Sequence, residues 1–291
     1  MRLGDRLRAV RPRATEAFNY IAAAKNATKL TNIDLLYLLT PIVTMAFSFG
    51  LVVYWHYRRS FTMWVLLYSL GAYAVAIALK FIIQIPTIGA FSSNQAALGL
   101  YYGMQTAAFE VGGAYVFATM AVSRRKFTSR EATGYGLGLA FWENGVLLSI
   151  PLLIDYITYY VILATPSSGL AQTILPILTR DSPGLFYGPS SALPLVFYAV
   201  LERLSSLMAH FAWGFLCVMA AVHKEKLYFA VAFPMGFIDF LVPFAGSLGT
   251  GLFELVVFLV SAACAVVALR ITSGVRRVQT APGSPPSVSA P

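Results

Sequence analysis

The sequence predicts an all-α protein, a polytopic transmembrane helical bundle of about seven spans. Hydrophobic residues make up 58% of the 291 residues and charged residues only 11%, whereas an ordinary soluble domain carries about 25% charge. The mean hydropathy is +0.71. This composition leaves too little polar surface to cover a soluble globule, and it also excludes a disordered chain and a coiled coil.

Seven apolar runs are long enough to cross a bilayer, since a spanning helix needs about 20 mostly apolar residues. They cover residues 35–55, 61–79, 96–122, 132–154, 193–222, 227–245 and 251–269. Residues 34–272 therefore form a transmembrane domain. A basic segment, 1–33, precedes it and is expected at the membrane interface. A Pro- and Ser-rich tail, 273–291, follows it and is expected to be disordered.

Basic residues gather at one end of these spans. Lys and Arg follow the first, third, fifth and seventh runs, whereas the opposite loops carry little besides Arg180 and Asp181. The positive-inside rule predicts a multi-pass protein of the cell membrane, with the N-terminus of the first span outside and the C-terminus in the cytoplasm. The basic segment 1–33 opposes this orientation. Since the net charge of +9 is explained by topology, no nucleic-acid partner is expected.

Four ionisable residues lie near the middle of four different spans, at similar depth: Glu110, Glu143, His210 and Asp239. Ionisable residues are costly inside a bilayer and usually serve a function. Each one alone is also compatible with a protonated or hydrogen-bonded side chain that holds two helices together. Their coincidence at one depth favours a shared site.

The fifth span carries a second polar group. Glu202, Ser206 and His210 follow one another at four-residue intervals, so they share a helix face. Glu202 lies roughly 12 Å outward of His210, too far to bind the same metal ion. Its expected partner is Arg203 or a base on another helix.

Other charged and small residues have simpler interpretations. Asp155 and Glu254 are expected near the solvated outer surface, and Lys80 is expected to reach the membrane edge with its long side chain. Gly134 and Gly138 form a G-x-x-x-G pattern. They predict close packing of the fourth span on the third.

The four midspan residues suit metal chemistry. Imidazole nitrogen and carboxylate oxygen bind zinc, a catalytic zinc site keeps one position for water, and a nearby carboxylate can act as general base. Serine chemistry fits less well, because Ser205 and Ser206 share the helix of His210. The sequence has no phosphate-binding loop and no C-x-x-C pair.

These residues stand in short motifs that resemble the YhfC-type intramembrane metalloproteases, relatives of the PrsW and CPBP (CAAX-protease-like) membrane peptidases. The similarity covers about residues 79–244 and begins with an apolar stretch, 78–86, that ends in Ile-Pro. The matching segments are Phe109-Glu110-Val-Gly-Gly-Ala114, the Gly-rich approach to Glu143-Asn144, Glu202-Arg203 with His210, and Met235-Gly-Phe-Ile-Asp239.

The resemblance implies peptide-bond hydrolysis inside the bilayer, with a membrane protein or a lipidated peptide as substrate and Zn²⁺ as cofactor. It implies catalytic roles for Glu110, as the water-activating carboxylate, and for Glu143. Glu143, His210 and Asp239 would bind the metal. The implied supporting residues are Glu202, Arg203 and Asn144.

Three positions depart from the family motifs. Val111 replaces a second Glu, Ala114 replaces a basic residue, and Met235 stands where the fourth motif has His. A thioether prefers softer metals than zinc. A second interpretation is therefore a catalytically degenerate relative that acts as a membrane scaffold or binding protein. A third is a transporter coupled to protons or cations.

Overall fold

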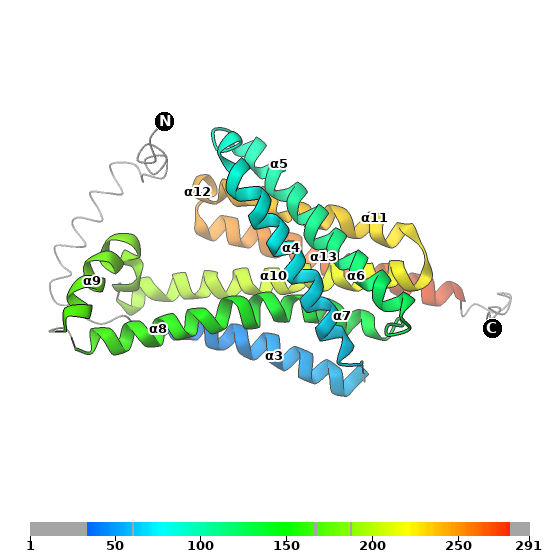
Figure 1. Ribbon diagram of the computed structural model, residues 1–291, viewed down its shortest axis with the longest axis horizontal. Helices are drawn as coiled ribbons and strands as arrows, with labels where there is room; N and C mark the ends of the chain where they lie inside the picture. Colours follow the sequence, from blue (N-terminus) through cyan, green and yellow to red (C-terminus); the bar gives the residue numbers. More distant parts are fainter. Residues whose placement is uncertain (1–33, 60, 166–167, 187, 280–291) are drawn as a thin grey trace. The chain divides into compact units, whose positions relative to one another are not determined.

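A computed structural model describes residues 34–59, 61–165, 168–186 and 188–279, which form helices and no strand (Figure 1). The all-α class is confirmed. The basic segment 1–33 lies outside the described residues, as does most of the expected tail. Residues 273–279 of that tail belong to a helix that ends at Gln279.

Six helices in the described part of the chain are long and apolar enough to cross a membrane, so the chain is a multi-pass membrane protein. They are Leu35–Arg58, Trp64–Ala90, Glu131–Leu163, Pro189–His223, Lys226–Leu248 and Thr250–Ile271. The remaining expected span, 96–122, is a continuous helical run of α5 (Gln95–Gln105), η5 (Thr106–Val111) and α6 (Gly112–Ser123). It is not among the six, because Gln105, Glu110 and four glycines lower its hydropathy.

The chain divides into two compact units. Among the described residues, unit 1 comprises residues 34–37 and those between Ile154 and Pro194. Its described part contains most of α8 (Ile150–Leu163), α9 (Gly169–Asp181) and η7 (Pro183–Phe186). The Ser168 side chain caps α9 by accepting a hydrogen bond of 3.1 Å from the Ala171 N–H.

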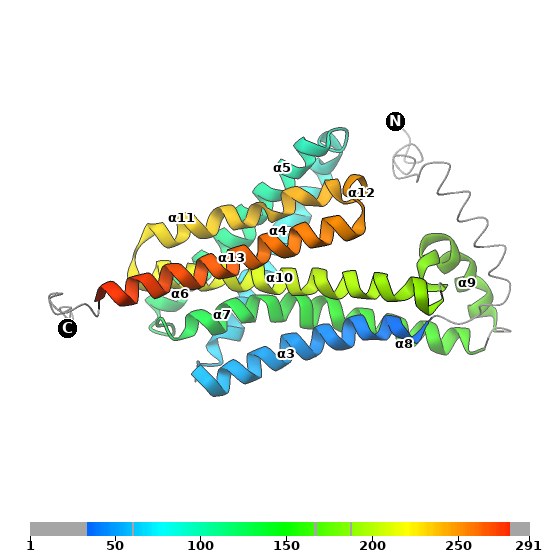
Figure 2. The ribbon, with the colours of Figure 1, turned by 180° about the vertical axis from the view of Figure 1, so that it is seen from behind.

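Unit 2 comprises Leu38–Leu153 and Leu195–Pro291 and contains every candidate site residue. Besides α5, η5 and α6, its helices are α3 (Leu39–Arg59), α4 (Trp64–Thr87), α7 (Glu131–Ala140), η6 (Phe141–Ser149), α10 (Pro189–His223), α11 (Lys226–Met235), η8 (Gly236–Phe244), α12 (Ala245–Leu248) and α13 (Thr250–Gln279). In α10, 72% of the most apolar stretch is buried, compared with 33% or less in the other five spans. Both ribbon views show α10 between α7 and α13 (Figures 1 and 2).

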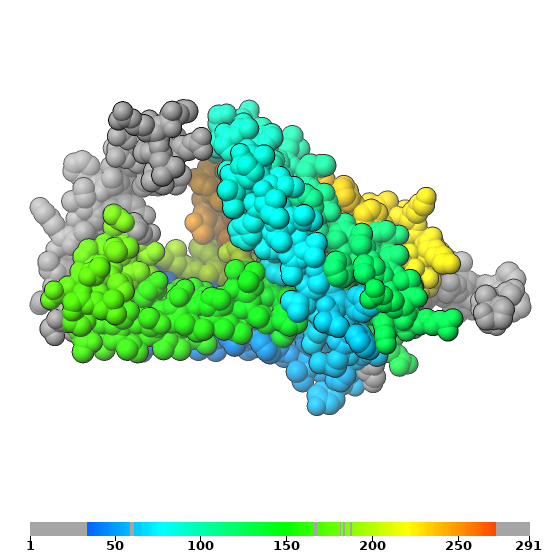
Figure 3. Space-filling view, in the orientation of Figure 1, coloured from blue at the N-terminus to red at the C-terminus, as the bar shows by residue number. Residues whose placement is uncertain are grey.

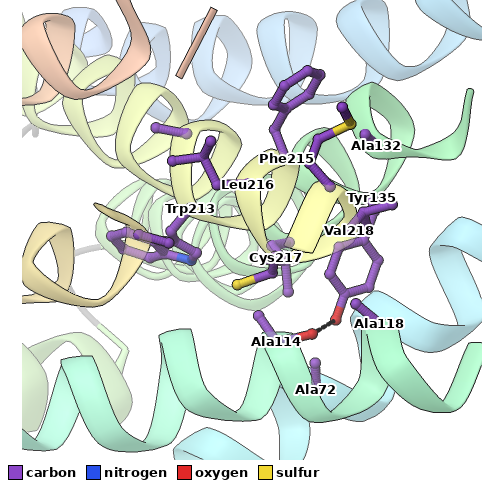
Figure 4. Close-up of a cluster of buried hydrophobic side chains, with 14 of the residues drawn as sticks. Ala72, Ala114, Ala118, Ala132, Tyr135, Trp213, Phe215, Leu216, Cys217 and Val218 are labelled. Carbon is purple, nitrogen blue, oxygen red and sulfur yellow. Dashed lines mark hydrogen bonds between the residues drawn. The ribbon is translucent and has the colours of Figure 1, made fainter. Parts of the chain in front are cut away.

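Small residues let the helices around α10 approach closely. A Cβ added to Gly136 of α7 would lie 2.5 Å from the Phe211 carbonyl oxygen, and one added to Gly214 would lie 2.7 Å from the Gly136 Cα. Tyr135, also on α7, donates a hydrogen bond of 2.9 Å to the Ala114 carbonyl (Figure 4). This packing fixes the central helix against its neighbours.

Gly134 and Gly138 do not pack against α6, contrary to the sequence prediction. A Cβ added to Gly134 would lie 2.6 Å from the Phe61 ring, and one added to Gly138 would lie 2.5 Å from the Ser69 hydroxyl. The close contact is therefore with α4 and the residues before it. Helix α4 also packs on α6, so it contacts both the third and the fourth spans, which meet each other through the Tyr135–Ala114 hydrogen bond and not through the two glycines.

The outer side of α4 is apolar and exposed. Leu67, Ile82 and Ile85 are 56%, 67% and 78% exposed, and α4 lies on the surface of unit 2 in the space-filling view (Figure 3). Such a face is costly in water and favourable in lipid. Unit 2 therefore has an apolar exterior and buries its polar side chains inside.

Candidate metal centre

Glu110 and Glu143 both lie in π-helical segments. Glu110 belongs to η5 and Glu143 to η6, and each segment continues directly into an α-helix on both sides. A π-helical turn carries an extra residue and changes which side chains face inward, and such turns occur frequently at functional sites. Both acids are thus directed to the interior by a local departure from α-helical geometry.

Three of the four midspan residues meet at one point. The His210 Nε2 lies 2.9 Å from Glu143 Oε2 and 3.2 Å from Glu110 Oε2. All three potential ligand atoms lie within 4.8 Å of one another. Glu110 and His210 are 8% and 4% exposed. A buried group of two carboxylates and one imidazole can bind a metal ion.

The other ring nitrogen fixes the tautomer of His210. Its Nδ1 lies 2.9 Å from the Ser206 carbonyl oxygen, which can only accept a hydrogen bond. The Nδ1 therefore carries a proton. The Nε2 faces two carboxylate oxygens yet makes no hydrogen bond of ordinary geometry among the described residues. Three lone pairs would then point at one another, so a cation, either a metal ion or a proton, is required between them.

A base or a hydroxyl holds the second oxygen of each carboxylate. Lys80 Nζ contacts Glu110 Oε1. Ser206 donates a hydrogen bond of 3.0 Å to Glu143 Oε1, and Arg203 lies 3.7 Å from the same oxygen. Metal-binding carboxylates and histidines usually have such outer partners, which orient the ligand atoms. Both acids therefore present their Oε2 to His210.

The supporting residues form a connected group beside Glu143. Arg203 pairs with Glu202, as the sequence predicts, and donates a hydrogen bond of 3.2 Å to Asn144 Oδ1. Asn144 in turn donates one of 3.1 Å to the Ser206 hydroxyl. Asn144 is 1% exposed, so its amide is committed to this network. These contacts hold the Arg203 guanidinium close to Glu143.

Asp239 lies beside the three-residue group and not within it. Its Oδ2 accepts a hydrogen bond from the Thr106 hydroxyl and lies 3.4 Å from Lys80 Nζ. Lys80 also donates a hydrogen bond of 2.6 Å to Thr106. The sequence analysis placed Asp239 among the metal ligands, whereas the structure pairs it with a base that also contacts Glu110.

Lys80 and Thr106 are the residues that sequence reasoning missed. The second apolar run ends at Lys80, which suggested a position at the membrane edge. Helix α4 instead continues to Thr87, with Pro86 inside its last turn, so Lys80 points into the bundle about two turns before the helix ends. The side chain is 14% exposed. Lys80 and Gln84 are one turn apart, so they share one face of α4. This spacing could have indicated a polar face directed into the bundle.

The network has a deficit of positive charge. Ion pairs connect four carboxylates, Glu110, Glu143, Glu202 and Asp239, with two bases, Lys80 and Arg203. When all six groups are ionised and His210 is neutral, a charge of −2 remains. Uncompensated charge is expensive in a low-dielectric interior. One divalent cation restores neutrality, as do two protons.

A cavity of about 370 Å³ opens beside this network. The lining includes Glu110, Glu143 and His210 and also Glu202, Glu254 and Ser261. Glu254 is 6% exposed, so it is not the solvated surface residue that the sequence analysis expected. Met235 is absent from the cavity wall and packs in the apolar core. A volume of this size can hold a small ligand and water.

No protein-family model, curated protein or solved structure matches this chain. What the protein does must therefore be inferred from the residues of the site and the chemistry that they allow.

Proposed function

We propose that unit 2 is a metal-assisted intramembrane hydrolase that cleaves a peptide bond in a membrane-embedded or lipidated substrate. The observation that carries the proposal is the convergence of His210 Nε2 with Oε2 of Glu110 and of Glu143. The choice of a peptide bond comes from the motif resemblance to the YhfC, PrsW and CPBP type of membrane peptidase.

The donor atoms fit a divalent ion such as Zn²⁺. The Nε2 of His210 is deprotonated once the ion replaces the proton, and the network lacks two positive charges. Glu143 and His210 would hold the ion, and Glu110 Oε2 would face it. When bound, zinc would make a water molecule acidic enough to attack a carbonyl near neutral pH.

The chain's own residues would accept the proton of the attacking water and position the metal ligands. Glu110 would accept the proton of the attacking water at Oε2, while Lys80 contacts its Oε1. Ser206 and Arg203 hold Glu143 in place. The substrate and water would enter from the side of Glu202 and Glu254, which line the cavity. With the orientation that the loop charges predict, this side faces outward, and the C-terminus is cytoplasmic.

One observation favours a membrane scaffold without hydrolase activity. Lys80 and Arg203 already pair with all four carboxylates of the network, so a protonated His210 with one further proton would complete a metal-free structural cluster. In that case Met235 and the ion pairs mark a site that holds helices together. The two functions differ in whether Glu110 is needed for cleavage.

The test compares wild type with Glu110→Gln after expression in the same host. New protein N-termini in the membrane fraction are identified by mass spectrometry. The hydrolase predicts termini that occur with wild type and disappear with Glu110→Gln. Asp155→Asn is the matched control, because Asp155 is exposed and lies in unit 1, and it should retain cleavage. Identical termini with Glu110→Gln at equal protein levels would contradict the proposal and favour the scaffold.

A further inference from the structure

Glu254 differs from every other carboxylate that lines the cavity. Each of the other four has Lys80 or Arg203 within ion-pair distance. Among the residues that the structure describes, no base pairs with Glu254, and its Oε2 has no hydrogen-bond partner. The residue is nevertheless 6% exposed. A buried carboxylate that accepts no hydrogen bond is costly. A positively charged ligand that donates a hydrogen bond to Glu254 would remove this cost.

The face of α13 around Glu254 is directed at the cavity. Glu254, Val257 and Ser261 all line it, at the spacing of one helix face. Phe253 and, from η8, Val242 add apolar wall beside the carboxylate. This part of the cavity wall thus combines one carboxylate that has no paired base with apolar side chains.

The charges of the site agree with a ligand of charge +1. A divalent ion at the proposed centre would balance the network that connects Glu110, Glu143, Glu202 and Asp239 with Lys80 and Arg203. Glu254 then remains as a single negative charge. A second divalent ion would overcompensate it, and the apolar neighbours offer no further oxygen ligands.

We propose that this end of the cavity binds a primary ammonium group on an alkyl stem, with Glu254 as its acceptor. An ammonium group donates three hydrogen bonds and places its methylenes on apolar surface, which matches a carboxylate beside Phe253 and Val242. The inference extends the proposed hydrolase, because it makes a substrate's ammonium group the element that is recognised. A peptide amine and an ethanolamine headgroup share this chemistry.

The experiment measures binding and needs no hydrolysis. Full-length protein is placed in phosphatidylcholine nanodiscs, whose quaternary headgroups donate no hydrogen bond. The probes are acetyl-Leu-Lys-Leu amide and its norleucine analogue, titrated by calorimetry. We expect the lysine peptide to bind about tenfold tighter, because a charge-assisted hydrogen bond is lost in the analogue.

The variants separate this site from the metal centre. Glu254→Gln should reduce binding of the lysine peptide to the level of the norleucine peptide, and Glu254→Asp should retain part of the difference. His210→Ala and the control Asp155→Asn should leave the difference intact. Lysine-dependent binding that persists in His210→Ala would support the ammonium site even if the proposed hydrolysis fails.

A second arm identifies the source of the ammonium group. Replacing a third of the lipid with phosphatidylethanolamine should weaken binding of the lysine peptide if a headgroup occupies the site, and should leave it unchanged if the natural ligand is a peptide amine. Equal affinity for the two peptides in wild type, or an unchanged preference for lysine in Glu254→Gln, would overturn the proposal.

Discussion

The His210 Nδ1 lies 2.9 Å from the carbonyl oxygen of Ser206, one turn earlier on the same helix. The main chain of α10 therefore sets the ring tautomer, and the opposite nitrogen is directed at two carboxylates from two other helical segments. A histidine oriented by a backbone carbonyl is a common arrangement in metal sites. This contact orients the ring of His210, which lies on the most buried of the six spans.

Divalent metal should stabilise the wild-type protein. A ligand that binds only the folded state raises the unfolding temperature with its concentration, and saturation about 100-fold above Kd contributes about 2.7 kcal/mol. Thermal unfolding in detergent should shift upward with micromolar zinc for wild type and not for His210→Ala. An equal shift in both would place the binding elsewhere.

The metal effect should weaken as the pH falls. Protons compete for His210 Nε2 and for the carboxylate oxygens, and ligands must be deprotonated to bind a metal ion. The zinc-induced shift of the unfolding temperature should therefore be larger at pH 8 than at pH 6. A shift that is independent of pH would argue against metal binding at His210 and the two carboxylates.

Lys80→Met should destabilise the fold. The substitution keeps the stem but leaves Glu110 and Asp239 without their common base, and removal of one partner from a buried ion pair costs about 3–5 kcal/mol. Lys80→Met combined with Asp239→Asn should recover part of this loss, since one unpaired carboxylate is removed. Additive losses in unfolding measurements would show that Lys80 and Asp239 are not coupled.

Gly136→Ala should weaken the packing of α7 on α10. The added Cβ would lie 2.5 Å from the Phe211 carbonyl oxygen, so the helices must separate. The cost should be about 1–3 kcal/mol in the free energy of unfolding. Gly50→Ala, in α3, is the matched control because nothing lies within 4 Å of its added Cβ, and it should be neutral or slightly stabilising. Equal effects of both would refute a close contact at Gly136.

The sequence predicted the helices and the convergence of three site residues for one physical reason. Ionisable side chains in a bilayer need partners, so Glu110, Glu143, His210 and Asp239 at one depth in different spans predict a shared site, and the structure brings the first three together. The distance of Glu202 from His210 predicted a partner other than the shared site, either Arg203 or a base on another helix, and the structure has Arg203. These inferences depend only on position along each span.

The remaining contacts depend on how the helices rotate, which depth along a span does not determine. The π-helical turns at Glu110 and Glu143 change the direction of the side chains, and the continuation of α4 past Pro86 brings Lys80 inside. Glu254 lies near the start of α13, where solvent was expected, yet it is covered by the cavity wall. Only tertiary packing decides which of these groups meet.

The most direct test of the metal centre is the metal content of detergent-purified protein, determined by mass spectrometry after mild purification. The account predicts about one divalent ion per chain in wild type and its loss in His210→Ala and in Glu143→Gln. It also predicts retention in Asp239→Asn, because Asp239 lies outside the three-residue group. A metal-free wild type, or a metal content that all three substitutions leave unchanged, would contradict a metal centre at Glu110, Glu143 and His210.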